Sequence, residues 1–583
     1  MKKIYNKISS LELLQKTKQA IFHFSKTEWK IFLILLLTLI ISTVWLLVNL
    51  NNAFMVSVPK RGGEISEGII GSPRFINPVL ANTDQDKDLS MLVYSGLTRK
   101  DGEGNIIPDL ALNYTISNDG LKYTFYLKND IYFHDGEEVT ADDIIFTINK
   151  VKDPLVRSPK KSAWDGVKVE KIDNKTVVFN LVEPFASFID NTTVGILPHY
   201  LFDENPMELS PLNENPIGSG PYKVTKLKKN NSGVASYYEL KSFSDFALGE
   251  PYIKKITLKF YNNENEIIQA LLKGDIDNAS SISAENANKL KEKNYKIETT
   301  VLPRIFALFF NHNQNQIFTD KSVLRAIDMA IDKDKIVKEV LLGYGIAIDD
   351  PILPDNFSYQ TLEQKKVIDH EESLKKAKEI LIKNGWTLND SGYLNKTITE
   401  NNKKVNKILE FSISTSNAPE LKKAGELIKA DLESIGMKVE IKTFDIGNLN
   451  QIVIRPRKYD ALLFGQIVKN EGDLFAFWHS SQRNDPGLNI AMYTNSKVDK
   501  ILEDAFKTIN DKDRLKKYAQ FGEEIKKDIP AVFIYSPNFI YAVSKELEGF
   551  DTRNIVNTEE RFSQVYSWRV QTEKVWKIFA KNY

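Results

Sequence analysis

The amino-acid sequence predicts an α/β protein with mixed sheets and more than one lobe, preceded by one transmembrane helix. The chain has 583 residues, more than the roughly 100 to 200 residues of one compact domain, so two or more lobes are expected. Beyond about residue 300, helical patterns alternate with strand-like runs, which indicates α/β layering. Residues 31–50 are charge-free and mainly apolar, long enough to cross a bilayer core of about 30 Å as a helix.

The charges beside this apolar run predict its orientation. Seven lysines and two glutamates precede it, so the positive-inside bias places residues 1–30 in the cytoplasm and the rest of the chain outside. A cleaved signal peptide is the alternative. The run exceeds the about 7 to 15 apolar residues of such signals, and no small-x-small cleavage site follows it. We therefore predict an uncleaved anchor at residues 31–50, a polar spacer at 51–60 and a single-pass cell-membrane protein.

The overall composition excludes several kinds of protein. Lys plus Arg number 78 against 77 Asp plus Glu, with no basic stripe beyond residue 30, so nucleic acid is not an expected partner. The chain has no cysteine, which rules out disulfides, thiolate metal sites, a cysteine nucleophile and a lipid-modified cysteine.

Periodicity locates the main elements. Residues 122–133 alternate apolar with polar side chains, which predicts a half-buried strand. In the run DKSVLRAIDMAIDKDKI, from residue 320, apolar residues recur at helical spacing. The remaining predicted helices span residues 373–385, 419–436, 498–509 and 514–528, and the strands between them span 407–414, 438–444, 459–467 and 531–537.

One stretch, FHDGEEVTADDIIFT at residues 133–147, has the density of acids expected of a metal or acid/base site. A turn at Asp135-Gly136 followed by a helix capped by Thr140 and Asp143 explains these acids without chemistry. His134 has no histidine partner at metal-ligand spacing. We therefore predict no metal here.

Other motifs do not predict catalysis either. The run NTDQDKD starts like a calcium loop but has Leu89 and Ser95 where that loop needs glycine and glutamate. Gly218-Ser219-Gly220 is not a nucleophile elbow, and the six histidines are scattered. We predict no catalytic residues, no metal and no cofactor. A serine-based triad assembled from distant residues, and hence an extracytoplasmic hydrolase, stays open as a remote alternative.

Several runs, in this order and spacing, resemble one family. They include GGEISEGIIGSPRFINPVL, YTFYLKNDIYFHDGEEVTADDIIFT, PIGSGPYKV, FTDKSVLRAIDMAIDKDKI, SLKKAKEILIKNGW and NIAMYTNSKVDKILEDA. Together they resemble the family 5 extracellular solute-binding proteins of ABC importers, the oligopeptide-, dipeptide- and nickel-binding group, over nearly all of residues 63–570.

The resemblance implies a two-lobed, periplasmic-binding-protein-like (type II) fold. Lobe 1 would comprise residues 61–302, with an inserted subdomain at 88–211, and residues 529–583 would return to it; lobe 2 would be 303–528. A peptide or similar small solute would bind between the lobes and favour hinge closure. ABC permease and ATPase subunits would be the partners of a monomeric ectodomain. A membrane-tethered sensor or scaffold with the same fold is the main alternative.

The resemblance also implies ligand-binding residues. Peptide-binding members present backbone groups from both lobes to an extended ligand, which here correspond to Asn82, Thr83 and Asp84 in lobe 1 and to Gly465, Gln466 and Ile467 in lobe 2. Peptide-binding members carry a Gly-Trp-x-x-Asp pattern, whose aspartate pairs with the ligand's amine. This sequence departs from that pattern, because Gln466 replaces the tryptophan and Lys469 replaces the aspartate. Glu471 or Asp473 could take the place of the aspartate through a loop change. A Lys469 that faces the cleft predicts an anionic or amine-blocked ligand.

The remaining candidates lie elsewhere in lobe 2. Arg304, Asn311 and His312 are near the predicted lobe junction, where binding sites tend to fall; a hinge ion pair and loop polar groups are the alternative interpretation. Trp478 and Phe475, in the aromatic cluster FAFWHSS, are candidates to line a pocket, with core packing as the alternative. Asn489 belongs to the matching run NIAMYTNSK.

Overall fold

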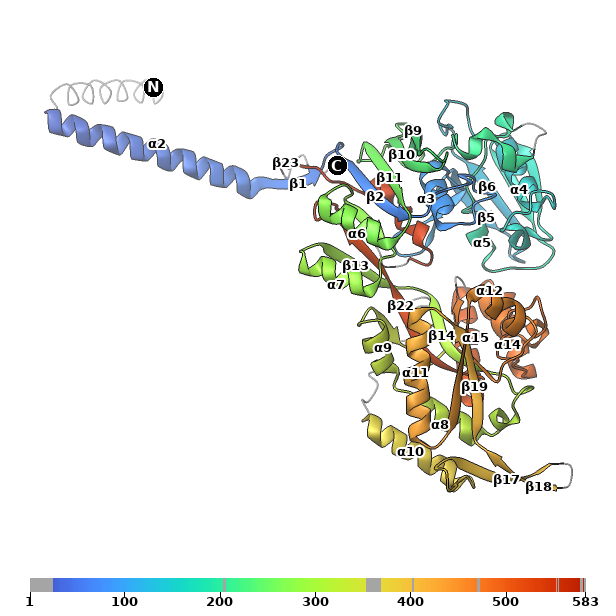
Figure 1. The fold of residues 1–583 in the computed structure, drawn as a ribbon. Helices are drawn as coiled ribbons and strands as arrows, with labels where there is room; N and C mark the ends of the chain where they lie inside the picture. The colour runs from blue at the N-terminus through green and yellow to red at the C-terminus, as the bar shows by residue number, and fades with distance from the viewer. Residues whose placement is uncertain are drawn as a thin grey trace, which may run out of the picture. The chain divides into compact units, whose positions relative to one another are not determined.

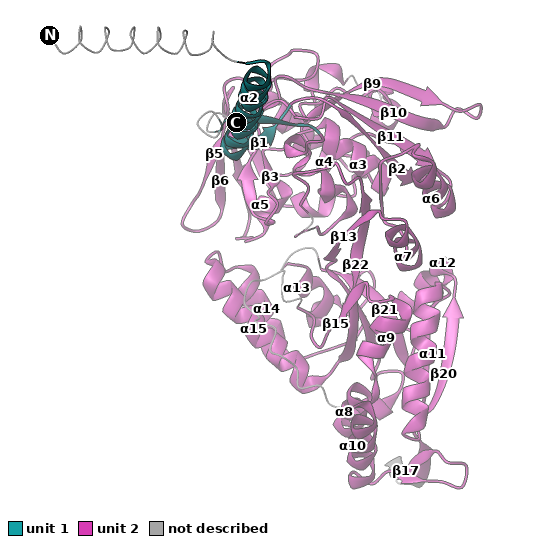
Figure 2. Cartoon of the chain, turned by 90° about the vertical axis from the view of Figure 1, so that its left-hand side faces the viewer, with its two compact units in different colours: residues 1–60, 571–583 teal, residues 61–570 magenta. Residues whose placement is uncertain are grey.

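The computed structural model describes residues 25–202, 206–352, 369–400, 403–468, 472–551, 553, 555–576 and 580. The chain divides into two compact units, residues 1–60 with 571–583 and residues 61–570 (Figure 2).

The first unit contains one long helix and a two-stranded ribbon. Helix α2 (Lys26–Phe54) begins at a capping box between Ser25 and Glu28, and its length and hydropathy suffice to cross a membrane. Strand β1 (Met55–Pro59) follows the helix directly and pairs antiparallel with β23 (Thr572–Trp576). The predicted helix is therefore present. The predicted spacer at 51–60 is instead the last helical turn and a strand, because β23 supplies the partner for MVSVP. Residues 1–24 of the predicted cytoplasmic segment lie outside the described residues.

A 12-stranded mixed sheet runs through the second unit (Figure 1). Its main path has the order β20-β19-β21-β14-β22-β12-β2-β11-β10-β9, and β13 and β15 also pair with β22. Strand β2 is parallel to β11 and β12, and β19 is parallel to β20 and β21. The predicted α/β class with mixed sheets is confirmed. The strands span β2 Glu64–Ile70, β9 Tyr222–Lys229, β10 Ala235–Ser242, β11 Lys255–Tyr261, β12 Asn278–Ser280, β13 Lys296–Val301, β14 Arg304–Phe310, β15 Gly345–Ala347, β19 Glu410–Ser416, β20 Lys438–Phe444, β21 Ala461–Ile467 and β22 Ala531–Val543.

The hydrophobic clusters of this unit divide it into two lobes. Two clusters draw their buried residues from 65–302 and 539–568, and two others from 305–535. Strand β22 contributes to both groups: residues 531–535 pair with β14, whereas residues 538–543 pair with β13. The chain therefore crosses between lobes near residue 303 and again inside β22, some eight residues beyond the predicted return at 529. Lobe 1 thus comprises residues 61–302 with 538–570, and lobe 2 comprises residues 303–537.

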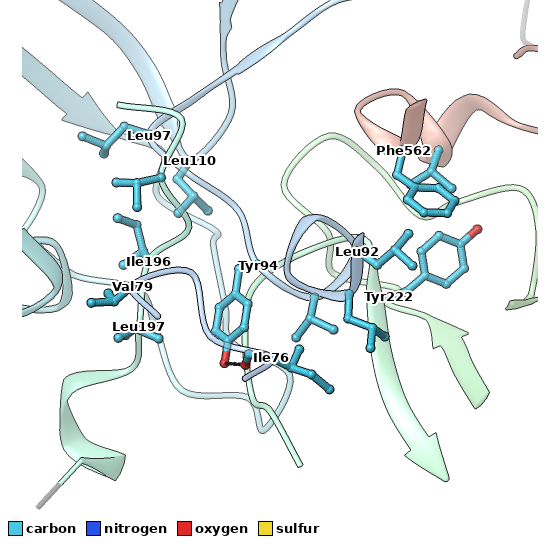
Figure 3. Close-up of a cluster of buried hydrophobic side chains, with 14 of the residues drawn as sticks. Ile76, Val79, Leu92, Tyr94, Leu97, Leu110, Ile196, Leu197, Tyr222 and Phe562 are labelled. Carbon is cyan, nitrogen blue, oxygen red and sulfur yellow. Dashed lines mark hydrogen bonds between the residues drawn. The ribbon is translucent and has the colours of Figure 1, made fainter. Parts of the chain in front are cut away.

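Lobe 1 contains a separate four-stranded sheet, ordered β5-β6-β8-β7. Its strands are β5 (Ala111–Ile116), β6 (Lys122–Leu127), β7 (Lys168–Asp173) and β8 (Thr176–Asn180), and helix α4 (Ala141–Lys152) packs beside it. Figure 3 shows part of the lobe 1 core, where Phe562 lies with Leu92 and Tyr222, and the Tyr94 hydroxyl donates to the Ile76 carbonyl at 3.4 Å. A segment from residue 562 thus completes a core built mainly before residue 260.

The predicted helices of lobe 2 are present, with ends shifted by a few residues. They are α8 (Lys321–Ala330), α9 (Lys333–Val340), α10 (His370–Lys383), α11 (Pro419–Ser434), α14 (Ser496–Phe506) and α15 (Asp511–Asp528), and a hairpin of β17 (Leu394–Glu400) and β18 (Lys403–Ile408) follows α10. In α8, the apolar residues Val323, Ala326, Ile327 and Ala330 are all buried, as their spacing predicts.

Candidate functional site

Three parallel strands of lobe 2 end at one edge of the sheet. Strand β19 is parallel to β20 and to β21, and the carboxyl ends of the three strands are Ser416, Phe444 and Ile467. In open α/β sheets, ligands bind in the crevice outside the carboxyl ends of the strands, where the strand order changes direction. The next strand beyond β21 is the antiparallel β14. This edge of lobe 2 is therefore the expected ligand side.

The backbone of β21 is open on one side near this edge. The strand pairs with β14 along its whole length, from Ala461 to Ile467, but with β19 only at Ala461 and Leu462. Farther along, the Leu463 carbonyl accepts a hydrogen bond from the Thr415 hydroxyl at 2.9 Å. Among the described strands, none pairs with the β19-facing side of residues 464–467, so the backbone there can add an extended peptide as a further strand.

Side chains at this end of β21 alternate between the two faces of the sheet. Ile467 lies opposite Arg304, and Gly465 opposite Phe306, so these four residues share one face. Gln466 lies opposite Ile305 on the other face and is only 6% exposed. The ligand-side candidates of β21 are thus the Gly465 backbone and the exposed Ile467 side chain, and Gln466 contributes its backbone.

Gly465 has a steric reason to be glycine. A Cβ atom at this position would lie 2.8 Å from a ring carbon of Phe306. That ring stacks on Tyr535 with centroids 4.8 Å apart and planes 19° from parallel. Burial raises the pKa of the Tyr535 hydroxyl well above its ordinary value, so the hydroxyl stays neutral. Sequence reasoning missed this aromatic pair, because β14 and β22 pair across more than 200 residues.

Arg304 begins β14 on the same face. Its Nε atom is buried and has no hydrogen-bond partner among the described residues. The backbone at this point is well held, because the Arg304 N–H donates to the Leu302 carbonyl at 2.7 Å. A buried guanidinium nitrogen without a partner is costly unless another group supplies an acceptor. The alternative interpretation of Arg304, a hinge ion pair, has no counter-ion among the described residues.

The lobe 1 candidates lie at the N-terminus of α3 (Asp84–Val93), beside the end of β2. The Asp86 carboxylate accepts hydrogen bonds from the backbone N–H groups of Arg74 and Phe75, at 2.6 and 2.8 Å, and the Gln85 amide contacts the Ile70 carbonyl. These contacts fix the loop that precedes the helix. Asn82, Thr83 and Asp84 are exposed, and the Thr83 hydroxyl caps the helix by accepting from the Asp86 N–H at 3.3 Å.

Asn311 and His312 are not at this site. They follow the other end of β14, seven residues from Arg304, which corresponds to roughly 20 Å of extended chain. The Asn311 side chain is 1% exposed, donates to the Arg457 carbonyl at 2.9 Å and accepts from the Asn313 N–H at 3.1 Å. The loop-polar interpretation therefore fits Asn311, because its bonds hold a turn.

Trp478 and Asn489 lie in the core of lobe 2. The Trp478 ring is 1% exposed, with Phe309 and Phe533 at centroid distances of 6.2 and 5.8 Å. The Asn489 amide donates to three backbone carbonyls, those of Trp478, His479 and Tyr493. Core packing thus describes both residues. Lys469 and Glu471 lie outside the described residues.

The acidic stretch at 133–147 has the predicted turn and capped helix. Asp143 accepts from the Thr140 N–H at 2.9 Å, and His134 bridges two glycines: Gly218 N–H donates to its Nδ1 at 3.3 Å, and its Nε2 lies 3.0 Å from the Gly220 carbonyl. Burial lowers the pKa of His134 to about 4. The contacts with Gly218 and Gly220 give His134 a structural role between the strand and the glycine turn.

The chain is similar to known proteins over most of its length. The model of the bacterial extracellular solute-binding proteins, family 5, matches residues 105–487. The oligopeptide-binding protein AppA of Bacillus subtilis is 30% identical over 518 residues, 86% of this chain and 92% of that protein. The glutathione-binding protein GsiB of Pectobacterium atrosepticum is 26% identical over 87% of this chain and 95% of that protein.

Two solved structures extend the comparison to three dimensions. AppA of Bacillus subtilis, in complex with a nonapeptide, has a TM-score of 0.65 at 28% identity and covers 88% of this chain and 100% of that chain. NikZ of Campylobacter jejuni, in complex with Ni(L-His), has a TM-score of 0.66 at 29% identity and covers 87% and 99% of the two chains. The described fold is therefore the type II periplasmic-binding-protein fold.

Proposed function

Because the chain belongs to the family 5 bacterial extracellular solute-binding proteins, and so is a binding protein and not an enzyme, we propose that it captures a carboxylate-bearing peptide or similar small solute for an ABC importer. Its partners would be the permease and ATPase subunits of that importer. The ligand would lie against the open side of β21 and the start of α3, at Asn82, Thr83 and Asp84.

The observation that carries this proposal is the unpartnered Nε of Arg304, which lies opposite Ile467 in β14, the strand that pairs with the other edge of β21. Arginine recognises carboxylates through charge-assisted, planar hydrogen bonds. A peptide added along Gly465–Ile467 would use backbone hydrogen bonds for affinity, and Arg304 would select its anionic group. The nonapeptide in AppA and the histidine in NikZ, both bound by relatives, also contain amino-acid carboxylates.

Lys469 would add a second positive charge if it faces the ligand. By direct spacing from Gly465, Lys469 stands where peptide-binding members of the family carry an amine-binding aspartate, so the preference would shift from free amines to anionic or amine-blocked groups. A Lys469→Asp variant with unchanged ligand preference would exclude this role. Glu471 and Asp473 remain the alternative partners for an amine.

Hinge closure would occur where the chain crosses between the lobes. The two crossings lie side by side, because the Leu302 N–H donates to the Pro537 carbonyl at 2.9 Å and the Ser536 hydroxyl donates to the Leu302 carbonyl at 2.5 Å. Few residues link the lobes covalently, which suits a rigid-body rotation about this point. The ligand would favour the closed state by its difference in affinity for the two states.

The anchor would keep this binding protein at the membrane. Helix α2 is 29 residues long, none of them buried, and its apolar run is longer than the core of a cleaved signal. The protein would then be a single-pass protein of the cell membrane with its binding unit outside. A mass of the membrane-extracted protein that lacks the residues before β1 would contradict retention of the anchor.

The decisive experiment compares matched ligands on the full-length protein. Random pentapeptides with free carboxyl termini would compete with the same peptides amidated, and native mass spectrometry would identify what binds. We expect the free acids to be enriched by about 10- to 100-fold, the range of one charge-assisted hydrogen bond to a buried partner.

Two arginine variants distinguish a specific role of Arg304 in carboxylate binding from a general effect of removing a positive charge. Arg304→Met should abolish the discrimination between acid and amide. Arg455→Met, which removes an exposed arginine of the same lobe, should keep it. Equal binding of acids and amides by the natural protein would refute carboxylate recognition, and binding of neither would refute peptide capture.

A further inference from the structure

The first unit contains a two-stranded ribbon, formed by β1 and β23, that ligand capture does not require. Strand β1 continues from α2 without an intervening loop, and β23 pairs with it over five residues, from Met55 opposite Trp576 to Pro59 opposite Thr572. More than 500 residues separate the two strands. Both ends of the segment 61–570 therefore continue into the same two-stranded ribbon.

The ribbon places a tryptophan at the polar end of the apolar run. The run ends at Leu50, and the next residue, Asn51, accepts a hydrogen bond through its side-chain oxygen from the Trp576 indole N–H at 2.9 Å. Trp576 lies opposite Met55, the ribbon residue nearest the helix. The indole is thus held where a membrane-spanning helix of about 20 residues would leave the hydrocarbon.

The same end of the ribbon exposes aromatic surface. Trp576 is 47% exposed and Phe54, the last helical residue, is 55% exposed. Lys574 lies on the same face of β23 as Trp576, two residues farther from the helix, and is exposed. Aromatic rings at the headgroup level, followed by a basic residue on the aqueous side, are the arrangement of membrane-interface anchors.

We propose that the β1–β23 ribbon is a membrane-interface element, in which Trp576 and Phe54 insert among the lipid headgroups of the outer leaflet and Lys574 faces the anionic surface. This inference rests on the proposed anchoring of α2 and adds a second contact with the bilayer. The chain on both sides of residues 61–570 would then be held at the membrane, through β1 on one side and β23 on the other.

The ribbon itself is tested first by a disulfide. The chain contains no cysteine, so introduced cysteines react without competition. Ser57 and Lys574 are opposed and both exposed, so the full-length double variant Ser57→Cys/Lys574→Cys should oxidise to one intramolecular disulfide, and each single variant should not. Failure of the double variant to cross-link under oxidation would overturn the ribbon and with it the proposal.

The position in the membrane is tested by spin labels on single cysteines. Full-length Thr572→Cys and Trp576→Cys variants, labelled and placed in phosphatidylglycerol–phosphatidylcholine liposomes, would be compared for collision with oxygen, which concentrates in lipid, and with a water-soluble nickel chelate. The label at 576 should favour oxygen several-fold over the label at 572. Equal access of the nickel chelate to both positions would overturn the proposal, even if the protein stays membrane-bound.

The natural indole is tested without a label. Lipids brominated near the headgroup quench the fluorescence of nearby tryptophans. The Trp576→Phe variant should therefore lose part of the fluorescence that these lipids quench. An unchanged quenched fraction in this variant would count against insertion of Trp576. The mass of the intact protein distinguishes failure of the proposed anchor from failure of the proposed interface element. A protein cleaved before β1 and released from membranes overturns both the anchor and the interface, whereas an intact, bound protein with an aqueous position 576 overturns only the interface.

Discussion

Phe185 of lobe 1 stacks on Phe506 of lobe 2, with ring centroids 4.8 Å apart and planes 12° from parallel. Beside the stack, the Ala186 N–H donates to the Phe506 carbonyl at 3.5 Å, and the Lys507 ammonium lies 3.9 Å from Glu183. The two lobes therefore meet through side chains in addition to the two chain crossings. Phe475, a pocket candidate from the sequence, packs against this stack at 5.9 Å from Phe506.

This stack should contribute to ligand affinity if it forms only when the lobes are together. An aromatic pair adds about 0.5–1.5 kcal/mol beyond its buried area, so Phe506→Ala should weaken binding of the captured solute by about 2- to 10-fold in a calorimetric titration. Tyr126→Ala, which removes an exposed ring of lobe 1, is the control. Wild-type affinity in both Phe506→Ala and Phe185→Ala would show that the contact is present in the open state as well.

Arg561 should be essential for the stability of lobe 1. Its guanidinium is fully buried and contacts two carboxylates, Glu67 at 2.8 Å and Asp88 at 2.6 and 2.7 Å. Tyr541 donates to Glu67 at 2.6 Å. Arg561→Met leaves both carboxylates without their cation, so the free energy of unfolding should fall by about 3–5 kcal/mol in urea denaturation. Arg553→Met, at an exposed ion pair, should leave the denaturation midpoint nearly unchanged, because exposed ion pairs contribute little.

The burial of His134 should lower the free energy of unfolding in acid. Its folded-state pKa of about 4 lies below the ordinary value of 6.5, so the neutral form is required in the native state. The stabilisation that comes from keeping His134 neutral is fully present above pH 6.5. It is lost as the pH falls toward 4, which lowers the free energy of unfolding by up to about 3 kcal/mol. Denaturation of the wild type and of His134→Gln across this range measures the difference. Parallel pH profiles would show that the histidine does not titrate in this way.

Local sequence patterns predicted those helices and caps that depend only on residues close together in the sequence. The helices α8, α11, α14 and α15 follow from apolar spacing within one segment, and the capped helix after Thr140 follows from two residues three positions apart, Thr140 and Asp143. The six-residue strand β6 is shorter than its predicted run of 122–133, because the chain bends at Asn129 and Asp130 and only Tyr132 pairs beyond the bend, in an isolated bridge with Glu138.

Long-range pairing could not be predicted in the same way. Arg561 and Glu67, Phe306 and Tyr535, and the two strands of the β1–β23 ribbon lie hundreds of residues apart, so no local periodicity connects them. The same limit explains the site candidates in the core. Trp478 ends a short helix and Asn489 lies in a loop, and composition alone does not distinguish a residue that packs inward from one that faces a ligand.

Glycine-to-alanine substitutions at two positions of lobe 2 should have opposite effects. At Gly465 the new Cβ would lie 2.8 Å from the Phe306 ring, which is held by Tyr535. Gly465→Ala should therefore displace that ring, lower the free energy of unfolding by about 1–3 kcal/mol and weaken ligand binding at the neighbouring strand backbone.

At Gly425, inside helix α11, the nearest atom to a new Cβ is 3.7 Å away, so Gly425→Ala should raise the free energy of unfolding by up to about 1 kcal/mol and leave binding unchanged. Urea denaturation and a ligand titration of both variants check the pair. A stable Gly465→Ala protein with normal affinity would mean that Phe306 can move without consequence, and the aromatic pair would then not belong to the ligand site.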